Sequence, residues 1–295
     1  LAGNRSITDL RFERSESNYR GIVLLSDDWV QILSNFLASN TFLRMFQLVN
    51  LGISNEQFII LSAGLSQSAI DELHVTGGKI GAGTDRTRVA GYLTESLGRL
   101  SSLNLKHLSL SANELGDDAV PAICTFLSQC DTLKKIDISR NYTMTNDCCQ
   151  LLASAIRGKS FELINIRWMQ MTSIGFEHFL PLIFDGTNIN STVESNHTLE
   201  IVSSYIDSSP MNMALKINRD TTLSTAEKIR MKVSHLHFRG QFSLLEVLNL
   251  NVMLMPHVLE FVATECGLSS MYRLVRCGKV AELFGFPSAD RLRAR

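Results

Sequence analysis

The sequence predicts an α/β solenoid, in which short parallel strands line a concave face and helices cover the convex face. The first observation behind this prediction is the stretch "LKHLSLSANEL" at residues 105–115. Its four leucines and Asn113 follow a spacing that fits neither a helix nor plain strand alternation. The second observation is that this spacing returns at residues 133 and 161, in steps of 28 residues. The third is that the chain beyond residue 206 changes to helical spacing.

Copies of the pattern are expected to start at residues 7, 43, 70, 105, 133, 161 and 199. The predicted strands lie near Phe46–Leu48, Leu73–Val75, Leu108–Leu110, Ile136–Ile138 and Ile164–Ile166. Three of the intervals are long, and their extra residues are expected to form loops near Ser15–Arg20, Gly81–Arg88 and Asp185–Ser195. Residues 1–206 are therefore predicted to form about seven irregular coils of one solenoid.

The copy that begins at Leu105 explains each element of a coil. Alternation along a short strand turns Leu108 and Leu110 toward a common core. Asn113 follows where the chain turns away, and its amide is expected to bond backbone groups that the turn leaves unpaired. Residues 117–127 then return as a helix whose apolar side faces the strands. One coil cannot bury both of its faces, so coils stack.

The segment "LSLSANELGDDAVPAICTFL" resembles the leucine-rich repeat family, and its strand, Gly-Asp turn and helix are most similar to the ribonuclease-inhibitor-like subtype. The resemblance covers about residues 7–206. The ladder asparagine is present only at Asn113 and Asn141, whereas other copies hold different residues there. The resemblance implies parallel concave strands, convex helices and an extended surface suited to binding proteins.

The remaining residues, 207–295, are predicted to form a helical capping region that covers the last hydrophobic face of the solenoid. "LSTAEKIRMKVSHLHF" has helical spacing behind a possible cap at Ser224, and two more apolar segments follow, the first interrupted at Pro256. The run "NHTLE…LKINR…MPHVLEFV…GLSSMYRLVR", which begins at residue 196, also resembles the carboxy-terminal part of leucine-rich repeat proteins from diatoms and related algae. That resemblance implies no activity.

Composition limits the classes of function. The 295 residues are 45% hydrophobic and 19% charged, with a formal net charge of −1, so no overall field favours nucleic acid as a partner. No apolar run is long enough to span a bilayer. The six cysteines lack zinc-type pairing and are expected to pack as small apolar residues. We expect an intracellular, reducing compartment, either cytoplasmic or organellar after loss of a targeting segment.

Motifs for chemistry are missing from the sequence. It has no Gly-rich phosphate loop, no Gly-x-Ser-x-Gly elbow and no His-Glu-x-x-His. His235 and His237 are assigned to a helix surface, and Cys148-Cys149 to helix packing. No catalytic, cofactor or metal site is therefore predicted, and a small-molecule substrate is not expected.

The leading hypothesis is a non-catalytic interaction module, acting as a scaffold, adaptor or accessory subunit that binds one or more proteins through its concave face. A repeat fragment of a sensor or receptor is one alternative. A GTPase-activating protein is another, suggested by a similar leucine-rich repeat family and by Arg20, Arg86 and Arg88 in the long loops.

The candidate binding surface follows from strand alternation, which turns side chains between the core positions outward. Exposed tryptophan, tyrosine and arginine are the residue types that dominate binding energy at interfaces, and Trp168 is the central candidate. The alternative is that Trp168 folds back under the next coil or under the loop at 185–195. The predicted protein-binding residues are Lys135, Asp137, Arg140, Asn165, Arg167, Trp168 and Tyr205, with Ser139 and Ser203 beside them.

Overall fold

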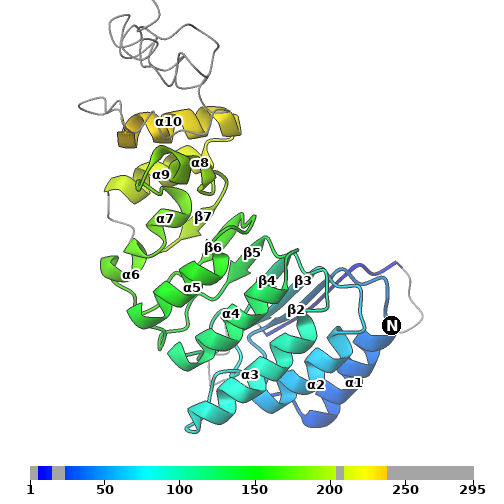
Figure 1. Ribbon diagram of the computed structural model, residues 1–295. Coiled ribbons are helices and arrows are strands. Elements are labelled where there is room, and N and C mark those ends of the chain that lie inside the picture. Colours follow the sequence, from blue (N-terminus) through cyan, green and yellow to red (C-terminus); the bar gives the residue numbers. More distant parts are fainter. Residues whose placement is uncertain (1–5, 15–23, 204–208, 238–295) are drawn as a thin grey trace, which may run out of the picture. The chain divides into compact units, whose positions relative to one another are not determined.

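A computed structural model describes residues 6–14, 24–203 and 209–237 (Figure 1). The chain divides into two compact units. Unit 1 comprises Leu1–Leu182 and Thr198–Asn212, and unit 2 comprises Ile183–His197 and Met213–Arg295. The predicted boundary between residues 206 and 207 stays a prediction, as do the two helices expected after residue 237, which lie outside the described residues.

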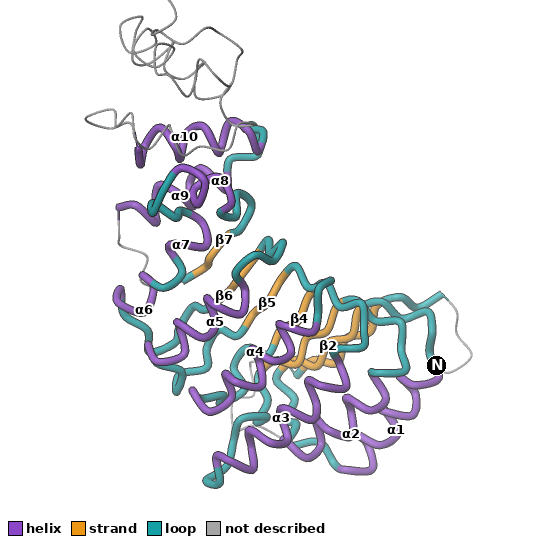
Figure 2. Tube along the Cα trace, viewed as in Figure 1, coloured by secondary structure: helices purple, strands orange, loops and turns teal. Residues whose placement is uncertain are grey.

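Unit 1 contains a single open sheet of seven parallel strands, and consecutive strands are neighbours throughout. The order of the strands in space is therefore the order in the chain, as Figure 2 shows. The strands are β1 (Asp9–Glu13), β2 (Met45–Val49), β3 (Glu72–Thr76), β4 (His107–Ser109), β5 (Lys135–Asp137), β6 (Leu163–Asn165) and β7 (Glu200–Val202). β2 to β6 overlap the five strands predicted from the sequence.

Helices follow the strands and form a second layer on one face of the sheet (Figure 1). Each of α1 to α5 packs on the next helix in sequence. The helices are α1 (Asp27–Ser39), α2 (Asn55–Leu65), α3 (Arg86–Leu100), α4 (Val120–Gln129) and α5 (Cys149–Ile156), followed by the short α6 (Ser173–Glu177) and α7 (Leu180–Ile183). This α/β architecture is compatible with the predicted solenoid.

The core of unit 1 lies between the two layers. Side chains at alternate strand positions point into it, and successive strands place these positions side by side. Phe46 pairs with Leu73, which pairs with Leu108 and then Ile136, and all four are at most 1% exposed. The register therefore brings one apolar residue from each strand to the same level.

The last strand corrects the predicted register by one residue. The sequence pattern starting at residue 199 equated Val202 with Ile164, but the structure pairs Ile164 with Ile201. Ile201 is fully buried, whereas Val202 is half-buried on the other side of β7. Both residues are β-branched and apolar, so the sequence alone does not distinguish which one faces the core.

The asparagine bonds predicted in the turns are confirmed. The Asn113 amide donates to the carbonyls of Val75 and Ser111, at 2.6 and 3.1 Å, and its oxygen accepts the Gly78 N–H. One coil further on, Asn141 accepts the backbone N–H groups of Asn113 and Leu115 and donates to backbone carbonyls in return. Both side chains are fully buried, so each amide links its own turn to the preceding one.

One residue with a left-handed backbone occupies the same place in five consecutive turns. Continuing the strand register past the strand ends aligns these five positions. The residues and their φ angles are Asn50 (56°), Gly77 (69°), Ala112 (54°), Arg140 (58°) and Trp168 (59°). Where the next turn is described, each N–H donates to the carbonyl that precedes the next left-handed residue, at 2.8–3.1 Å. A bulky residue rarely adopts this conformation.

Unit 2 is helical in its described part. It contains α8 (Ile189–Glu194), most of α9 (Ser209–Arg219) and α10 (Thr225–His237). The predicted loop at 185–195 is wrong in part, because Asn188 caps α8 there by accepting the Ser191 N–H. The predicted cap at Ser224 is confirmed: it accepts the Glu227 N–H while the Glu227 carboxylate accepts the Ser224 N–H. The sequence reading missed α9.

Unit 2 buries a lysine. The Lys232 ammonium on α10 donates to the carbonyls of Ile183 and Asn196, at 2.6 and 3.2 Å, and lies 3.2 Å from Nδ1 of His197. Burial, followed by the nearby Lys228, lowers the pKa of Lys232 to about 7. Burial and then the Lys232 charge lower the pKa of His197 to about 4. The ammonium therefore ties α10 to the end of α7 and to the segment after α8, at an electrostatic cost.

Candidate functional site

The structure exposes four of the seven predicted binding residues. Lys135 on β5 and Arg140, Arg167 and Trp168 in the turns that follow β5 and β6 are all exposed. The Arg140 N–H donates to the Arg167 carbonyl at 2.8 Å, so the two turns are adjacent. Tyr205 lies outside the described residues.

Asp137 and Asn165 bind each other across adjacent strands. They are paired in the register, and the Asn165 amide donates to the Asp137 carboxylate at 3.0 Å. The other Asp137 oxygen accepts the N–H of Ser139. Ser139 is itself buried, which corrects its prediction as a surface residue, because the chain has already turned inward there. Asp137 and Asn165 are half-buried, and they end the strands that lead into the turns of Arg140 and Arg167.

Trp168 is 53% exposed, so the alternative in which it folds back into the core is wrong. Its left-handed backbone is unfavourable for a residue of this size. Gly77, which tolerates this conformation without a penalty, holds the equivalent place two strands before Arg140. Trp168 is therefore a large exposed aromatic residue at a turn position whose left-handed backbone recurs in five successive turns, only one of which holds glycine.

Tyr142 is a candidate that the sequence reading missed. It is 59% exposed, and with Arg140 it lines a cleft of about 490 Å³ in unit 1. Strand alternation does not identify Tyr142, because it lies in the turn beyond the strand. The sequence feature that could have identified Tyr142 is its position directly after Asn141. The Asn141 side chain points into the core, and the next side chain, that of Tyr142, is on the surface. Arg140, Tyr142, Arg167 and Trp168 together are called the turn patch.

The arginines of the GTPase-activating alternative are engaged inside unit 1. Arg86 donates to the Gly81 carbonyl at 2.6 Å and lies 3.5 Å from the Asp118 carboxylate. Arg88 donates to the Tyr92 hydroxyl at 2.6 Å. Arg20 lies outside the described residues. These contacts give Arg86 and Arg88 structural roles, and no observation favours their use on a nucleotide.

A group of side chains suited to a metal ion lies on β3 and β4, on the sheet face opposite the helices. It consists of Glu72, His74 and His107, whose ligand atoms all lie within 4.8 Å of one another. Burial lowers the pKa of both imidazoles, and the two rings meet edge to face with centroids 4.4 Å apart. The sequence reading missed this group because residues 74 and 107 are far apart in sequence and only the strand register brings them together.

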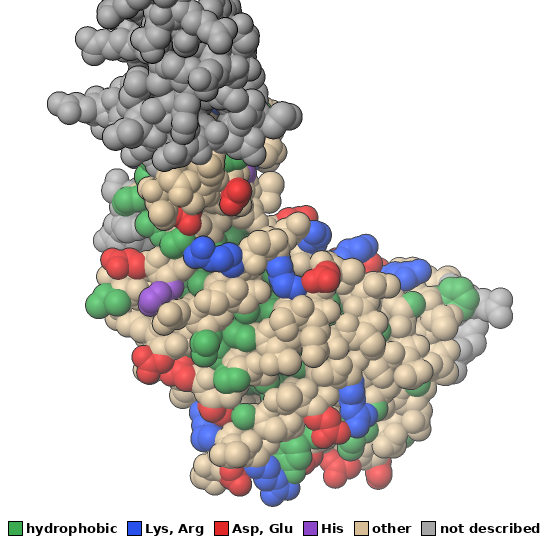
Figure 3. Space-filling model, viewed as in Figure 1, with side chains coloured by type: hydrophobic (Ala, Val, Ile, Leu, Met, Phe, Trp, Pro, Cys, Tyr) green, Lys and Arg blue, Asp and Glu red, His purple; other side chains and the backbone are tan. Residues whose placement is uncertain are grey.

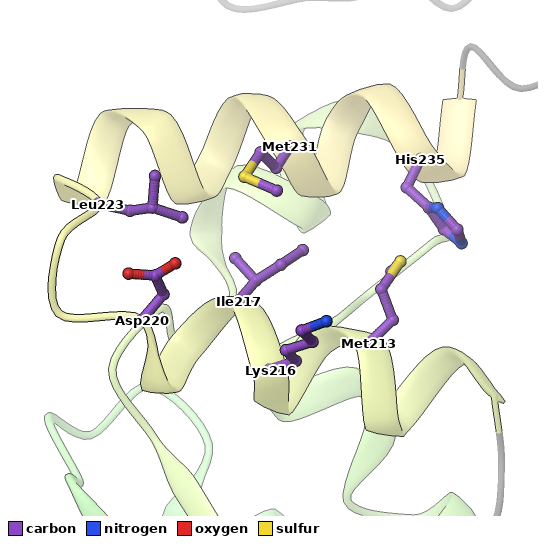
Figure 4. A pocket seen from close by; sticks show the side chains of 7 residues that line it. All are labelled: Met213, Lys216, Ile217, Asp220, Leu223, Met231 and His235. Atoms are coloured by element: carbon purple, nitrogen blue, oxygen red, sulfur yellow. The ribbon is translucent and has the colours of Figure 1, made fainter.

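Unit 2 has a groove of about 400 Å³ between α9 and α10 (Figure 4). Met213, Ile217, Leu223 and Met231 form its apolar lining, and Figure 4 shows His235 at one end. Two amphipathic helices leave a groove of this kind between them where their side chains do not interlock. We assign this groove no function.

Comparisons with known proteins add no family to this geometry. No protein-family model matches the chain, and no curated protein matches it. Within the described ranges, no helix has the length and apolar character to cross a membrane.

Proposed function

We propose that the chain is a leucine-rich repeat solenoid that binds another protein through the turn patch and the adjoining strand face, as a scaffold, adaptor or accessory subunit. The ordered parallel sheet, the matching left-handed turns and the asparagine bonds between turns support the solenoid. Stacked coils of this kind present an extended surface without needing a catalytic centre.

The observation that carries the proposal is the exposed Trp168 in a left-handed turn. The left-handed backbone itself belongs to the fold, because it recurs in five successive turns of which only one holds glycine, so what distinguishes this turn is its large exposed aromatic side chain. Arg140 and Arg167 lie in adjacent turns, Trp168 directly follows Arg167, and Tyr142 follows Arg140 by two residues, so the turn patch has the residue types that contribute most to protein interfaces.

Charge also favours a protein partner. On the face shown in Figure 3, Lys and Arg side chains lie among Asp and Glu side chains. The net charge of −1 agrees with that mixture. Tight binding to a nucleic acid needs a basic stripe that neutralises phosphates, whereas an aromatic residue with neighbouring arginines suits a folded protein or a peptide.

The test compares proteins captured from an extract of the source cells by the full chain and by its variants. Trp168→Ala is expected to weaken the interaction by about 2 kcal/mol or more, and Arg140→Ala to weaken it less. The matched control is Leu151→Ala, which removes an exposed apolar side chain from α5. Quantitative mass spectrometry should find proteins that Trp168→Ala loses and Leu151→Ala retains. Equal capture by all variants would refute the turn patch.

A further inference from the structure

We propose that Glu72, His74 and His107 form a binding site for a divalent transition metal ion of the zinc class. This site is distinct from the turn patch and does not depend on the proposed function. Glu72 and His74 are two residues apart on β3, so they share one face of the sheet. His107 is the direct partner of Glu72 on β4, which brings the second imidazole to the same place.

The distances are close to those that a bound ion requires. Glu72 Oε2 lies 3.7 Å from His74 Nε2 and 3.9 Å from His107 Nδ1. Tetrahedral zinc, with bonds of about 2.0–2.1 Å, places its ligand atoms about 3.3 Å apart. Small side-chain rotations therefore bring all three atoms into coordination. The backbone need not move, because adjacent strands already fix the Cα positions.

The Nε2 atom of His74 lacks a partner in the described structure. It is buried and makes no hydrogen bond, since 3.7 Å to the Glu72 carboxylate exceeds hydrogen-bond distance. Buried polar atoms nearly always have a partner. A metal ion held between this nitrogen and the Glu72 oxygen supplies one, and the carboxylate then offsets part of the charge of the ion.

The charges around the two rings partly oppose each other. Burial lowers the pKa of His74 and of His107, because desolvation disfavours the charged imidazolium. Asp137 adds negative charge near both imidazoles, whereas Arg11 acts against the ion from the side of His74 and Lys135 from the side of His107. The opposing cations are exposed and screened, so the inner ligands dominate.

The ligand set selects the class of metal. Two imidazoles and one carboxylate suit zinc and its neighbours, whereas calcium and magnesium prefer sites made only of oxygen atoms. The Glu72 side chain is 42% exposed, so a fourth position faces solvent and accepts water or a side chain of a bound protein.

The test is a titration of the full chain with Zn²⁺ alone, after treatment with a chelator, by calorimetry and by competition with a coloured chelator. The wild type is expected to bind one equivalent that Glu72→Gln and His74→Ala weaken by more than about tenfold. Glu72→Gln preserves the size of a partly exposed side chain, so this variant is expected to fold. It therefore tests the site even if His74→Ala does not fold. The control is His178→Ala, an exposed histidine elsewhere in unit 1, which should bind like the wild type.

Cobalt separates this site from the cysteines. In the wild type, Co²⁺ bound at the site that Glu72→Gln loses should show weak visible bands. It should show no intense thiolate-to-cobalt absorption. A lost equivalent with strong thiolate absorption would overturn the assignment. Identical stoichiometry and affinity in the wild type and in both ligand variants would also overturn it, as would a wild type that binds no Zn²⁺.

Discussion

The two compact units bury polar groups in different ways. In unit 1, the neutral amides of Asn113 and Asn141 both donate and accept, and their partners are backbone groups of adjacent turns. In unit 2, the charged Lys232 donates to backbone carbonyls and to His197. An amide satisfies two kinds of backbone group without carrying charge, whereas an ammonium satisfies acceptors only.

The difference has a consequence for how each unit responds to pH. A buried amide does not titrate, so the asparagine links should be equally strong across the neutral range. The pKa of Lys232 is lowered to about 7, well below that of an exposed lysine. Between these two values the unfolded chain binds more protons, so the free energy of unfolding of unit 2 rises with pH.

The largest expected effect comes from giving unit 1 a titratable group. Asn141→Asp keeps the shape of the side chain but removes both amide donors, which leaves the Leu110 and Ile138 carbonyls facing a carboxylate. We expect a loss of about 3 kcal/mol or more in the free energy of unfolding at pH 7. Urea unfolding measures it.

The same variant should also acquire a dependence on pH. Burial beside carbonyls raises the pKa of the new carboxyl above its unfolded value of about 3.9, so its stability is greatest in acid and falls as pH rises. Asn104→Ala, at an exposed asparagine, is the control and should change little. A stability of Asn141→Asp equal to that of the wild type would show that the buried links are dispensable.

A smaller effect is expected for Lys232→Met. At pH 9 the loss should be about 1–2 kcal/mol, because Lys232 is a neutral amine above its pKa of about 7 and still donates to buried carbonyls, which methionine leaves without that donor. The rise in unfolding free energy between pH 7 and 10.5 should flatten. The exposed Lys216 provides the control, Lys216→Met, which should keep the rise. An unchanged pH profile in Lys232→Met would assign the titration to another group.

The smallest effect concerns the left-handed turns. Ala112→Gly relieves an unfavourable φ of 54° and should raise the free energy of unfolding by about 0.5–1 kcal/mol. The control is Ala90→Gly, within α3, where glycine should destabilise the helix by a similar amount. Thermal unfolding of both variants gives the comparison. A loss of stability in Ala112→Gly would mean that the methyl group is needed in its turn.

The parallel strands of unit 1 were predictable because each copy repeats the same short spacing of buried residues, although the interval between copies varies. Phe46, Leu73, Leu108 and Ile136 mark one level of the core, and no charged residue interrupts that level. The register of β7 was missed because Ile201 and Val202 are equally apolar neighbours. The helix α8 was missed because six residues give too short a helical pattern to detect.

The candidate sites were only partly predictable. Trp168 and Arg140 follow from their places after predicted strands, but their left-handed backbone is set by bonds between turns that no local pattern reveals. His74 and His107 meet only through the register of β3 and β4, across an irregular interval of 35 residues. Tertiary pairing, and not residue type, brings these side chains together.

The central claim is that Trp168 is kept for binding and not for folding, and the free energy of unfolding of Trp168→Gly tests it without a known partner. Glycine relieves the left-handed backbone, while the lost contacts are those of a half-exposed ring. We predict that urea unfolding places this variant within about 1 kcal/mol of the wild type. A loss of about 3 kcal/mol or more, as for a buried aromatic residue, would contradict the claim.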